Sequence, residues 1–359
     1  MTAPKTLPIR GRGAPDNPPN RFRPIEVVPD PEAADDAPAP RTRFFEDATR
    51  SVLSYNDSPD VGFDVSVNPY RGCEVGCIYC YARQFHEYLG FSAGLDYETR
   101  ILVKRDAPTL LRAALAAPSW TPKVIALSGA TDPYQPAERS LRITRGCLEV
   151  LAETRNPVAI ITKRDLVRRD VDLLARLADA GAAAVTVSVT TLDGDLQRVM
   201  EPRGAAPHRR LEAVRRLAAA GIPVGINVAP VIPGLTDHEI PAILEAGAEA
   251  GATRAAFILL RLPHGIKELF EGWLERHFPA RRERVLARIR ETRGGRLYDS
   301  RFRVRGRGEG VYADHIGAMF QVAAARLGLD RAWRPLSTTA FRRPRAGTQL
   351  GLFDDPHGR

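Results

Sequence analysis

The stretch PVAIITKRDLVRRDVDLLARLADAGAAAVTVSV, residues 157–189, decides the fold. A short β-branched run at 157–162 is followed by a helical stretch at 165–181 and then by a second β-branched run at 183–189. The helical stretch ends in glycine, which most readily adopts the left-handed conformation found after a helix C-terminus. A strand, a helix and a strand in this order predict a βαβ unit, which belongs to a parallel sheet.

The same alternation continues on both sides of this unit. We expect further strands at 63–67, 123–128, 223–230 and 255–260, and further helices at 107–117, 140–154, 208–221 and 237–251. Six such units are too few for a closed eight-fold barrel, so the pattern predicts an open, partial barrel or a doubly wound sheet. In both architectures ligands bind at the carboxyl ends of the strands, where we therefore expect the functional site.

The segments that flank this core differ from it in composition. Residues 1–42 contain ten prolines and no apolar period, which predicts a disordered tail. We place the boundaries at 1–45 for the tail, 46–262 for the barrel core, 263–340 for a basic, mostly helical extension and 341–359 for a flexible tail. In the extension, 281–295 and 311–329 are expected to be helical, and 296–308 to be a basic loop or hairpin.

The positive charge is concentrated at one end of the chain. Residues 261–359 hold 21 of the 52 Lys and Arg residues but only 11 of the 43 Asp and Glu residues, so the net charge of +9 arises there. A basic segment attached to a neutral body is typical of proteins that bind polyanions. The alternative is a solvated, arginine-rich helix face.

Composition also limits the compartment. No apolar run approaches the roughly 18–20 residues that span a bilayer, and residues 1–22 lack the hydrophobic region of a secretory signal. Four cysteines in 359 residues do not make a disulfide framework. We expect a cytoplasmic protein without a membrane partner, in which clustered cysteines serve metal or redox chemistry.

Three of the four cysteines, Cys73, Cys77 and Cys80, lie within eight residues just after the first expected strand. Thiolates select iron–sulfur clusters, zinc or Cu(I), and a cubane [4Fe–4S] cluster normally takes four cysteines. Three cysteines leave one iron open to coordinate a small molecule, which suits catalysis better than a structural role. Two alternatives stay open, namely a zinc site completed by His86 and three thiols without a shared ligand.

The C-x3-C-x2-C spacing, with an aromatic residue before the last cysteine, resembles the signature of the radical S-adenosylmethionine (SAM) superfamily. NPYRGCEVGCIYCYAR (68–83), SGATDPYQPAE (128–138), TKRDLVRRDVDLL (162–174) and PVIPGLTD (230–237) resemble the branch that contains spore photoproduct lyase. The resemblance implies an α/β fold, a partial (β/α)6 TIM-type barrel with a helical basic extension. It also implies a [4Fe–4S] cluster that cleaves SAM reductively to methionine and a 5′-deoxyadenosyl radical, which abstracts a hydrogen atom from the substrate.

The resemblance further indicates the residues that hold the two cofactors. Cys73, Cys77 and Cys80 would ligate the cluster. The residues that would contact SAM are Tyr79, Ser128, Gly129, Ala130, Thr131, Lys163, Ser188 and Asn227. Residues 128–130 take the place of the family's glycine-rich stretch, and Lys163 that of a lysine paired with the SAM carboxylate. For Arg203 and Arg210 two readings stay open, contact with an anion and a solvated helix face, and we favour the solvated face.

One departure from the branch concerns the loop that follows the second strand. In spore photoproduct lyase this loop carries a cysteine that donates a hydrogen atom to the product radical, and residues 128–138 contain none. Cys147 lies inside the expected helix 140–154 and is expected to be a small buried hydrophobic residue. Reversal of a thymine dimer by that route therefore lacks its donor, and the catalytic residues stay unknown.

Near the C-terminus, QLGLFD (349–354) resembles the short peptide that docks bacterial DNA repair and replication proteins into the sliding clamp. Gln349, Leu350, Leu352 and Phe353 would fill its groove, unless the segment docks onto its own domain. Together with the basic last quarter, the motif favours DNA as a partner. A further expected partner is an electron donor such as flavodoxin or ferredoxin.

Three functions are compatible with these patterns. The first is a radical SAM enzyme, lyase-like, that repairs or modifies a base in DNA. The second keeps the same chemistry but acts on RNA, protein or a small molecule. The third is a non-catalytic nucleic-acid-binding protein with a structural iron–sulfur or zinc site.

Overall fold

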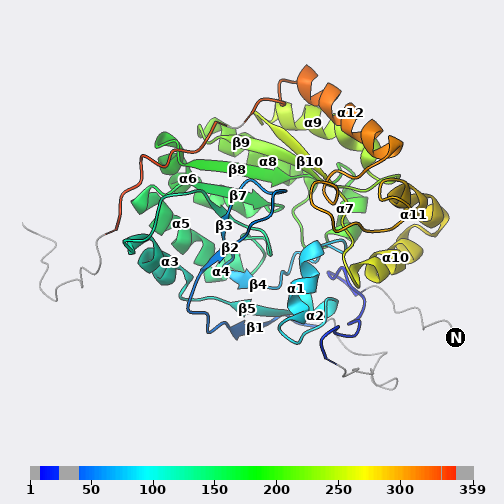
Figure 1. Cartoon of the computed structure of the whole chain (residues 1–359), viewed down its shortest axis with the longest axis horizontal. Coiled ribbons are helices and arrows are strands. Elements are labelled where there is room, and N and C mark those ends of the chain that lie inside the picture. The colour runs from blue at the N-terminus through cyan, green and yellow to red at the C-terminus, as the bar shows by residue number, and fades with distance from the viewer. Residues whose placement is uncertain (1–8, 24–39, 333, 345–359) are drawn as a thin grey trace, which may run out of the picture.

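The computed structural model describes residues 9–23, 40–332 and 334–344. Its centre is a seven-stranded sheet with the strand order β10-β9-β8-β7-β6-β3-β2 (Figure 1). The strands are β2 (Leu53–Tyr55), β3 (Val65–Val67), β6 (Ile125–Leu127), β7 (Val158–Thr162), β8 (Ala183–Ser188), β9 (Val224–Val231) and β10 (Ala255–Leu259). Only β2 runs antiparallel to its neighbour in this sheet.

Six parallel strands follow one another in both chain order and sheet order, and β10 does not pair with β2. The helices between them are α3 (Ala107–Ala116), α4 (Glu138–Leu141), α5 (Ile143–Thr154), α6 (Val171–Asp179), α7 (Gly194–Met200), α8 (Pro207–Ala219) and α9 (Ile240–Glu249). Because side chains on both faces of β8 and β9 are buried, the sequences of these two strands are apolar runs rather than alternating patterns. The predicted partial (β/α)6 barrel is confirmed, and the doubly wound alternative is not.

Two of the expected helices begin differently from the prediction. The stretch 140–154 is divided at Arg142, which has a left-handed φ of 56° and separates α4 from α5. The stretch 165–181 starts as a 3-10 turn at Asp165–Asp170 before α6. Both breaks lie near a buried ion-pair network around Glu138 and Asp170, whose geometry fixes the local backbone.

A second sheet, with the order β1-β5-β4, is not predicted by the sequence pattern. It comprises β1 (Arg43–Glu46), β4 (Tyr70–Arg71) and β5 (Arg100–Val103), and the short helices α1 (Gln84–Glu87) and α2 (Leu95–Thr99) lie between β4 and β5. These elements are too short to show a period, and the side chains of β1 are exposed. The sheet supports the cysteine-containing loop, which begins directly after β4.

After β10 the chain forms α10 (Ile266–His277), α11 (Arg282–Glu291) and α12 (Val311–Arg326). The expected helices of the extension are thus confirmed, and 296–308 is a loop of turns. Residues of α10 and α11 share a hydrophobic cluster with Cys73, Cys77 and Tyr79. None of the helices in the described part of the chain is long and apolar enough to cross a membrane. The clamp-like residues 349–353 lie outside the described residues.

Candidate active site

The cysteine-containing loop (residues 72–80, hereafter the cysteine loop) lies beyond β3 and β4, near the carboxyl ends of the parallel strands. Cys73 and Cys77 are buried and Cys80 is partly exposed, and none forms a disulfide. Backbone hydrogen bonds fix the loop at both ends, from Cys73 N–H to the carbonyl of Tyr97 (2.8 Å) and from Ile78 N–H to that of Met200 (3.0 Å).

The three cysteines are close enough for the charges of Cys73 and Cys80 to act on Cys77. Burial and the charge of Glu201 raise the pKa of Cys77, and the charges of Cys80 and Cys73 raise it further. Burial also raises the pKa of Cys73, while backbone N–H groups of Asp132 and Val75 favour its thiolate. N–H groups directed at a cysteine sulfur are a usual second shell of iron–sulfur ligands. The donor set therefore suits a metal that replaces the thiol protons.

The zinc alternative finds no support in the described part of the chain, where no three His, Cys, Asp or Glu side chains are arranged to hold a single metal ion. His86 packs against the rings of Phe91 and Tyr97, and burial lowers its pKa to about 4. In a cubane cluster each cysteine binds a different iron, so the three sulfurs do not have to converge on one point.

The second loop of the site, residues 128–132, lies against the cysteine loop. Asn68 at the end of β3 accepts the backbone N–H groups of Ala130 (3.0 Å) and Thr131 (3.3 Å). The hydroxyls of Tyr81 and Tyr97 donate to the carbonyls of Gly129 (2.6 Å) and Ala130 (3.0 Å). Gly129 has a φ of 121°, which only glycine adopts without strain. The predicted backbone contact region is thus held beside Cys80, whose sulfur lies 3.6 Å from the Tyr97 hydroxyl.

Behind the cysteine loop, Tyr79 and Lys163 converge on a buried carboxylate, Glu201. Glu201 accepts hydrogen bonds from the Tyr79 hydroxyl and from Thr190 (2.8 Å), and Lys163 Nζ lies 3.5 Å from it. Arg210 donates to the other carboxylate oxygen and is itself buried. Although burial would raise the pKa of Glu201, the charges of Arg210 and Lys163 lower it to about 2. The glutamate is therefore ionised at neutral pH.

The expectation that Arg203 and Arg210 lie on a solvated helix face is wrong. Arg210 bonds the carbonyls of Ala205 (2.7 Å) and Ser188 (3.0 Å) besides Glu201. Arg203 pairs with Glu74 of the cysteine loop at 2.8 Å. The spacing of arginines along a helix does not reveal that the face toward the strands contacts a buried carboxylate such as Glu201. The sequence analysis did not identify Glu201 as a site residue. Its one distinguishing feature in the sequence is its position between the short helix α7 and the turn formed by residues 202–204.

Ser188 and Asn227 are neighbours in register on β8 and β9, so their side chains share one face of the sheet. Both are buried. The side-chain oxygen of Asn227 has no hydrogen-bond partner among the residues that the structure describes. A buried polar atom without a partner is costly unless a ligand or water supplies one, so this pair fits the predicted role of contacting a bound cofactor.

Lys163 directly follows β7, at the predicted strand end, but its ammonium group already interacts with other groups of the protein. Its ammonium group donates to the carbonyl of Ala229 (2.6 Å) and to Thr190 (3.3 Å) besides pairing with Glu201. A lysine has three donors, so pairing with a SAM carboxylate would require it to exchange one of these acceptors.

Residues 9–23 form a strap across the outer side of the cysteine loop, although the sequence predicts them within a disordered tail. A Cβ built at Gly13 would lie 1.9 Å from the carbonyl oxygen of Gly76. Asn17 and Asp96 exchange two hydrogen bonds, of 3.1 and 2.8 Å. The strap has no apolar period because its backbone and short polar side chains, rather than an apolar face, find partners on the body.

The strap reaches the cysteine loop through one buried ion pair. Glu98 accepts the backbone N–H groups of Gly13 and Ala14, each at 2.9 Å. The same carboxylate pairs with Arg83 at 2.5 Å, and both side chains are fully buried. Arg83 in turn donates to the carbonyl of Cys77 at 2.9 Å. Through these contacts we expect the position of Cys77 to depend on the strap.

Replacement of Gly13 by alanine tests this dependence. The added Cβ cannot fit against Gly76, so we expect a loss of about 1–3 kcal/mol in the free energy of unfolding and less iron bound per chain after reconstitution. In the matched control Gly194→Ala, the new Cβ meets nothing within 4 Å. Urea unfolding and iron analysis measure both effects. Equal iron content and stability in Gly13→Ala and the wild type would show that the strap does not position the loop.

Comparison with known proteins agrees with this geometry. The sequence profile of the family described as "Radical SAM superfamily" matches residues 67–247. The uncharacterized protein Rv2578c of Mycobacterium tuberculosis is 38% identical over 253 residues, which cover 69% of this chain and 73% of that protein.

Among solved structures, a serine-for-cysteine mutant of spore photoproduct lyase has a TM-score of 0.56 at 18% identity and covers 79% of both chains. A structure described as spore photoproduct lyase complexed with dinucleoside spore photoproduct has a TM-score of 0.50 at 18% identity and covers 66% of both chains. These likenesses concern the fold, whereas the profile spans the cysteine loop, the 128–132 loop, Lys163 and the strands that carry Ser188 and Asn227. The chain therefore belongs to the radical SAM superfamily and is a radical SAM enzyme, with a [4Fe–4S] cluster and SAM as its cofactors.

Proposed function

We propose that the protein uses its radical SAM chemistry on DNA, to repair or modify a base. The observation that carries the radical chemistry is the trio Cys73, Cys77 and Cys80 beside the 128–132 loop, at the carboxyl ends of parallel strands. The observation that carries DNA is the basic excess in residues 261–359. When bound, the cluster and SAM together supply a carbon-centred radical able to take a hydrogen atom from an unactivated carbon of the substrate.

The chain's own residues bind and orient these groups. The three cysteines hold the cluster, and the 128–131 backbone, with its Tyr81 and Tyr97 supports, forms one wall for the amino acid part of SAM. Ser188 and the unpartnered oxygen of Asn227 offer polar contacts on the sheet face. Lys163 and Tyr79 act on Glu201 and keep the region behind the cysteine loop rigid.

Two observations support DNA as the substrate. Spore photoproduct lyase, whose fold resembles that of this chain, has a solved structure in complex with dinucleoside spore photoproduct. The basic excess lies in the last quarter of the chain, and arginine contacts to phosphates are the main source of affinity for nucleic acids. Because Cys147 is buried in α5 and the 128–132 loop has no cysteine, the lesion differs from the spore photoproduct or is handled by another donor.

Transfer of a labelled hydrogen tests the proposal. The reconstituted enzyme is given SAM, a reductant and DNA whose carbon-bound hydrogens are deuterium, and the released 5′-deoxyadenosine is analysed by mass spectrometry. We expect deuterium in the 5′-deoxyadenosine with DNA and none with equally labelled RNA. Label from RNA alone, or from neither, would contradict the proposal.

The partners proposed from the tail and the redox chemistry have their own tests. Deletion of 349–353 is expected to abolish binding to the sliding clamp in a pull-down while leaving iron content unchanged.

Reduction by flavodoxin or ferredoxin is expected to replace a chemical reductant in SAM cleavage.

Replacement of Asn227 by alanine separates ligand binding from stability. Because Asn227 Oδ1 has no partner within the described ranges 9–23, 40–332 and 334–344, its removal is expected to leave the free energy of unfolding unchanged or slightly higher. Loss of a polar contact to SAM is expected to weaken SAM binding about tenfold, a net 1–2 kcal/mol, as measured by calorimetry.

Asn156 supplies the opposite control. Its amide donates to the carbonyls of Lys123 and Pro157, each at 3.1 Å, and accepts from Trp120 at 3.2 Å. Asn156→Ala is therefore expected to cost about 1–3 kcal/mol of stability without changing SAM affinity. If Asn227→Ala instead lost stability and kept SAM affinity, Asn227 would be structural.

A further inference from the structure

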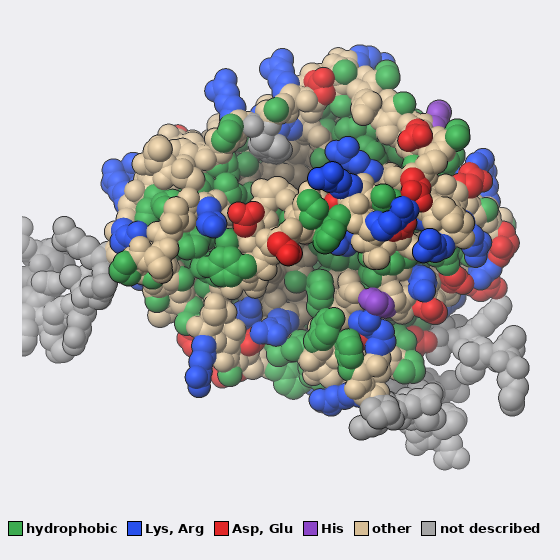
Figure 2. All heavy atoms as spheres, in the orientation of Figure 1, with side chains coloured by type: hydrophobic (Ala, Val, Ile, Leu, Met, Phe, Trp, Pro, Cys, Tyr) green, Lys and Arg blue, Asp and Glu red, His purple; other side chains and the backbone are tan. Residues whose placement is uncertain are grey.

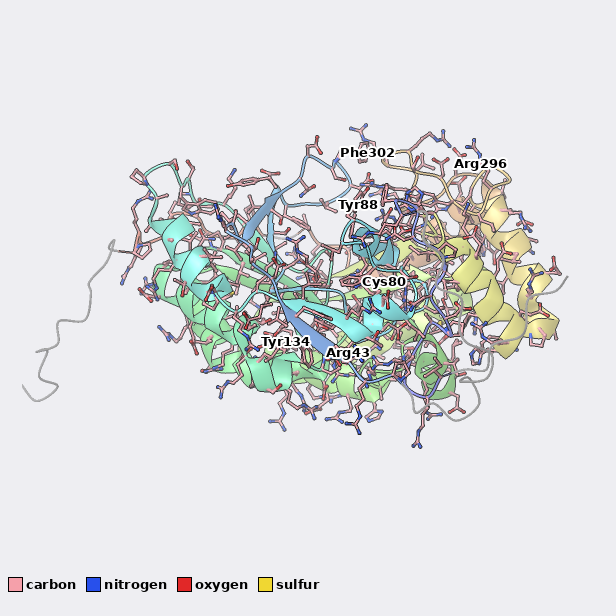
Figure 3. All side chains as sticks on the ribbon, turned by 90° about the horizontal axis from the view of Figure 1, so that it is seen from below. Arg43, Cys80, Tyr88, Tyr134, Arg296 and Phe302 are labelled. Carbon is pink, nitrogen blue, oxygen red and sulfur yellow. The ribbon has the colours of Figure 1, made fainter. Side chains whose placement is uncertain are left out.

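We propose that an aromatic face beside the cysteine loop, formed by Phe22, Tyr88 and Phe302, binds single-stranded DNA by stacking its unpaired bases. The inference rests on the proposed function and adds the form of the substrate. All three residues are exposed, with 53% of Phe22, 68% of Tyr88 and 53% of Phe302 accessible to solvent, whereas most large apolar side chains of the described residues are buried. Figure 3 shows Phe302 and Tyr88 on the same side of Cys80.

Phe302 is held at the carboxyl end of β10 rather than on a free loop. The carbonyl of Gly306 accepts the N–H of Leu259 at 2.8 Å, and Asp60 accepts the backbone N–H of Arg303 at 2.6 Å as well as the Arg305 side chain. The guanidinium of Arg305 lies 4.5 Å from the centre of the Phe302 ring. The ring is thus fixed in an exposed position with a cation on one face, and its remaining surface is open to a ligand.

Phe22 and Tyr88 form a second exposed element. Their ring centres are 4.8 Å apart and the rings are stacked at 26°, while the Arg21 guanidinium lies 4.9 Å from the Phe22 ring. Phe22 belongs to the strap, which Arg21 ties to Glu87 at 2.7 Å. Two large rings stacked in water still expose apolar surface, and such surfaces mark binding sites when cations flank them.

Residues 261–264 lie between the two elements and connect them to the active site. The guanidinium of Arg261 lies 4.5 Å from the centre of the ring of Tyr81, the neighbour of Cys80. The Nε of Arg261 is buried and has no hydrogen-bond partner in the part of the chain that the structure describes. His264 lies near the strap, since burial and the charge of Arg21 lower its pKa. An anion at Arg261 would therefore lie between Phe302 and the Phe22–Tyr88 pair, close to the reacting atoms.

The charges on this face fit a phosphate backbone. Arg303 and Arg307 are exposed and form no ion pair with any residue that the structure describes. Figure 2 shows Lys and Arg side chains gathered beside hydrophobic ones on this side of the molecule. Exposed rings in the neighbourhood of the cations Arg303 and Arg307 match single-stranded nucleic acid, because the bases of a duplex are already stacked on one another and cannot lie on a protein ring.

Fluorescence anisotropy with the reconstituted full chain tests the assignment. The probe is a labelled oligothymidine, compared with the same strand annealed to oligoadenosine. We expect tighter binding to the single strand, and about tenfold weaker binding to it for Phe302→Ala, the effect of one lost base stack. Phe44→Ala is the matched control, because Phe44 is similarly exposed (47%) but lies on β1, whose Arg43 Figure 3 shows on the other side of Cys80 from Phe302 and Tyr88. It is expected to bind as the wild type does.

Salt dependence separates stacking from charge. Phe302→Ala is expected to keep the wild-type slope of log affinity against log salt, and Arg303→Ala to reduce the slope by about one phosphate contact. Wild-type affinity in both Phe302→Ala and the double variant Phe22→Ala/Tyr88→Ala would overturn the inference, as would duplex binding that equals or exceeds single-strand binding. SAM cleavage by the same preparations is scored separately. Its absence would contradict the proposed function, whereas normal cleavage with unaltered binding would contradict this surface alone.

Discussion

Cys77→Ala is expected to abolish cluster binding, with iron and sulfide after anaerobic reconstitution falling to the level of a protein without a site. The remaining Cys73 and Cys80 are too few to retain a cubane, which needs at least three protein thiolates when SAM takes the fourth iron. Iron and sulfide analysis with visible absorbance measures the effect. The same loss is expected for Cys73→Ala and Cys80→Ala.

Cys147 provides the matched control within the same chain. It is buried in α5, away from the cysteine loop, and packs among apolar residues of the barrel wall. Cys147→Ala is therefore expected to lose some stability but to bind as much iron as the wild type. Equal iron in Cys77→Ala and Cys147→Ala would mean that the cysteine loop is not the cluster site.

Among substitutions of the buried polar residues behind the cysteine loop, Glu201→Gln is expected to lower the free energy of unfolding the most. It leaves the buried Arg210 without its counter-ion and weakens the hold on Tyr79 and Lys163. Breaking a buried ion pair in this way costs about 3–5 kcal/mol. Chemical denaturation at neutral pH measures the loss, and Glu212→Gln on the exposed side of α8 is the control, where no measurable change is expected.

The pH dependence of the same pair gives a second readout. An unfolded glutamate titrates near pH 4.3, whereas the folded pKa of Glu201 is lowered to about 2. A depressed folded pKa contributes stability that is fully present above the unfolded pKa and is lost as pH falls toward the folded value. The difference in stability between the wild type and Glu201→Gln is thus expected to shrink from about pH 5 to pH 2. A difference that is constant over this window would contradict an ionised, buried Glu201.

Much of the barrel follows from the sequence because buried parallel strands are continuous β-branched runs. The runs at 157–162 and 183–189 correspond to β7 and β8 within a residue. The register of these strands then brings Ser188 and Asn227 side by side, which individual strand assignments cannot foresee. The cysteine spacing likewise indicates the chemistry, because three close thiolates have few uses.

The parts that escaped prediction depend on contacts between distant segments. Glu201 and Arg210 are charged residues whose burial is set by packing of α7 and α8 against the strands, and no local period records it. The strap is ordered by Glu98, which lies 85 residues from Gly13. Composition alone predicts disorder there, because it counts apolar residues and not the partners available to backbone N–H groups.

The most direct test of the central claim is SAM cleavage by the reconstituted, strictly anaerobic enzyme with dithionite. The account predicts that 5′-deoxyadenosine and methionine form in equal amounts, and that neither forms with Cys77→Ala. Intact SAM after incubation with wild-type protein that carries its full complement of iron and sulfide would contradict it.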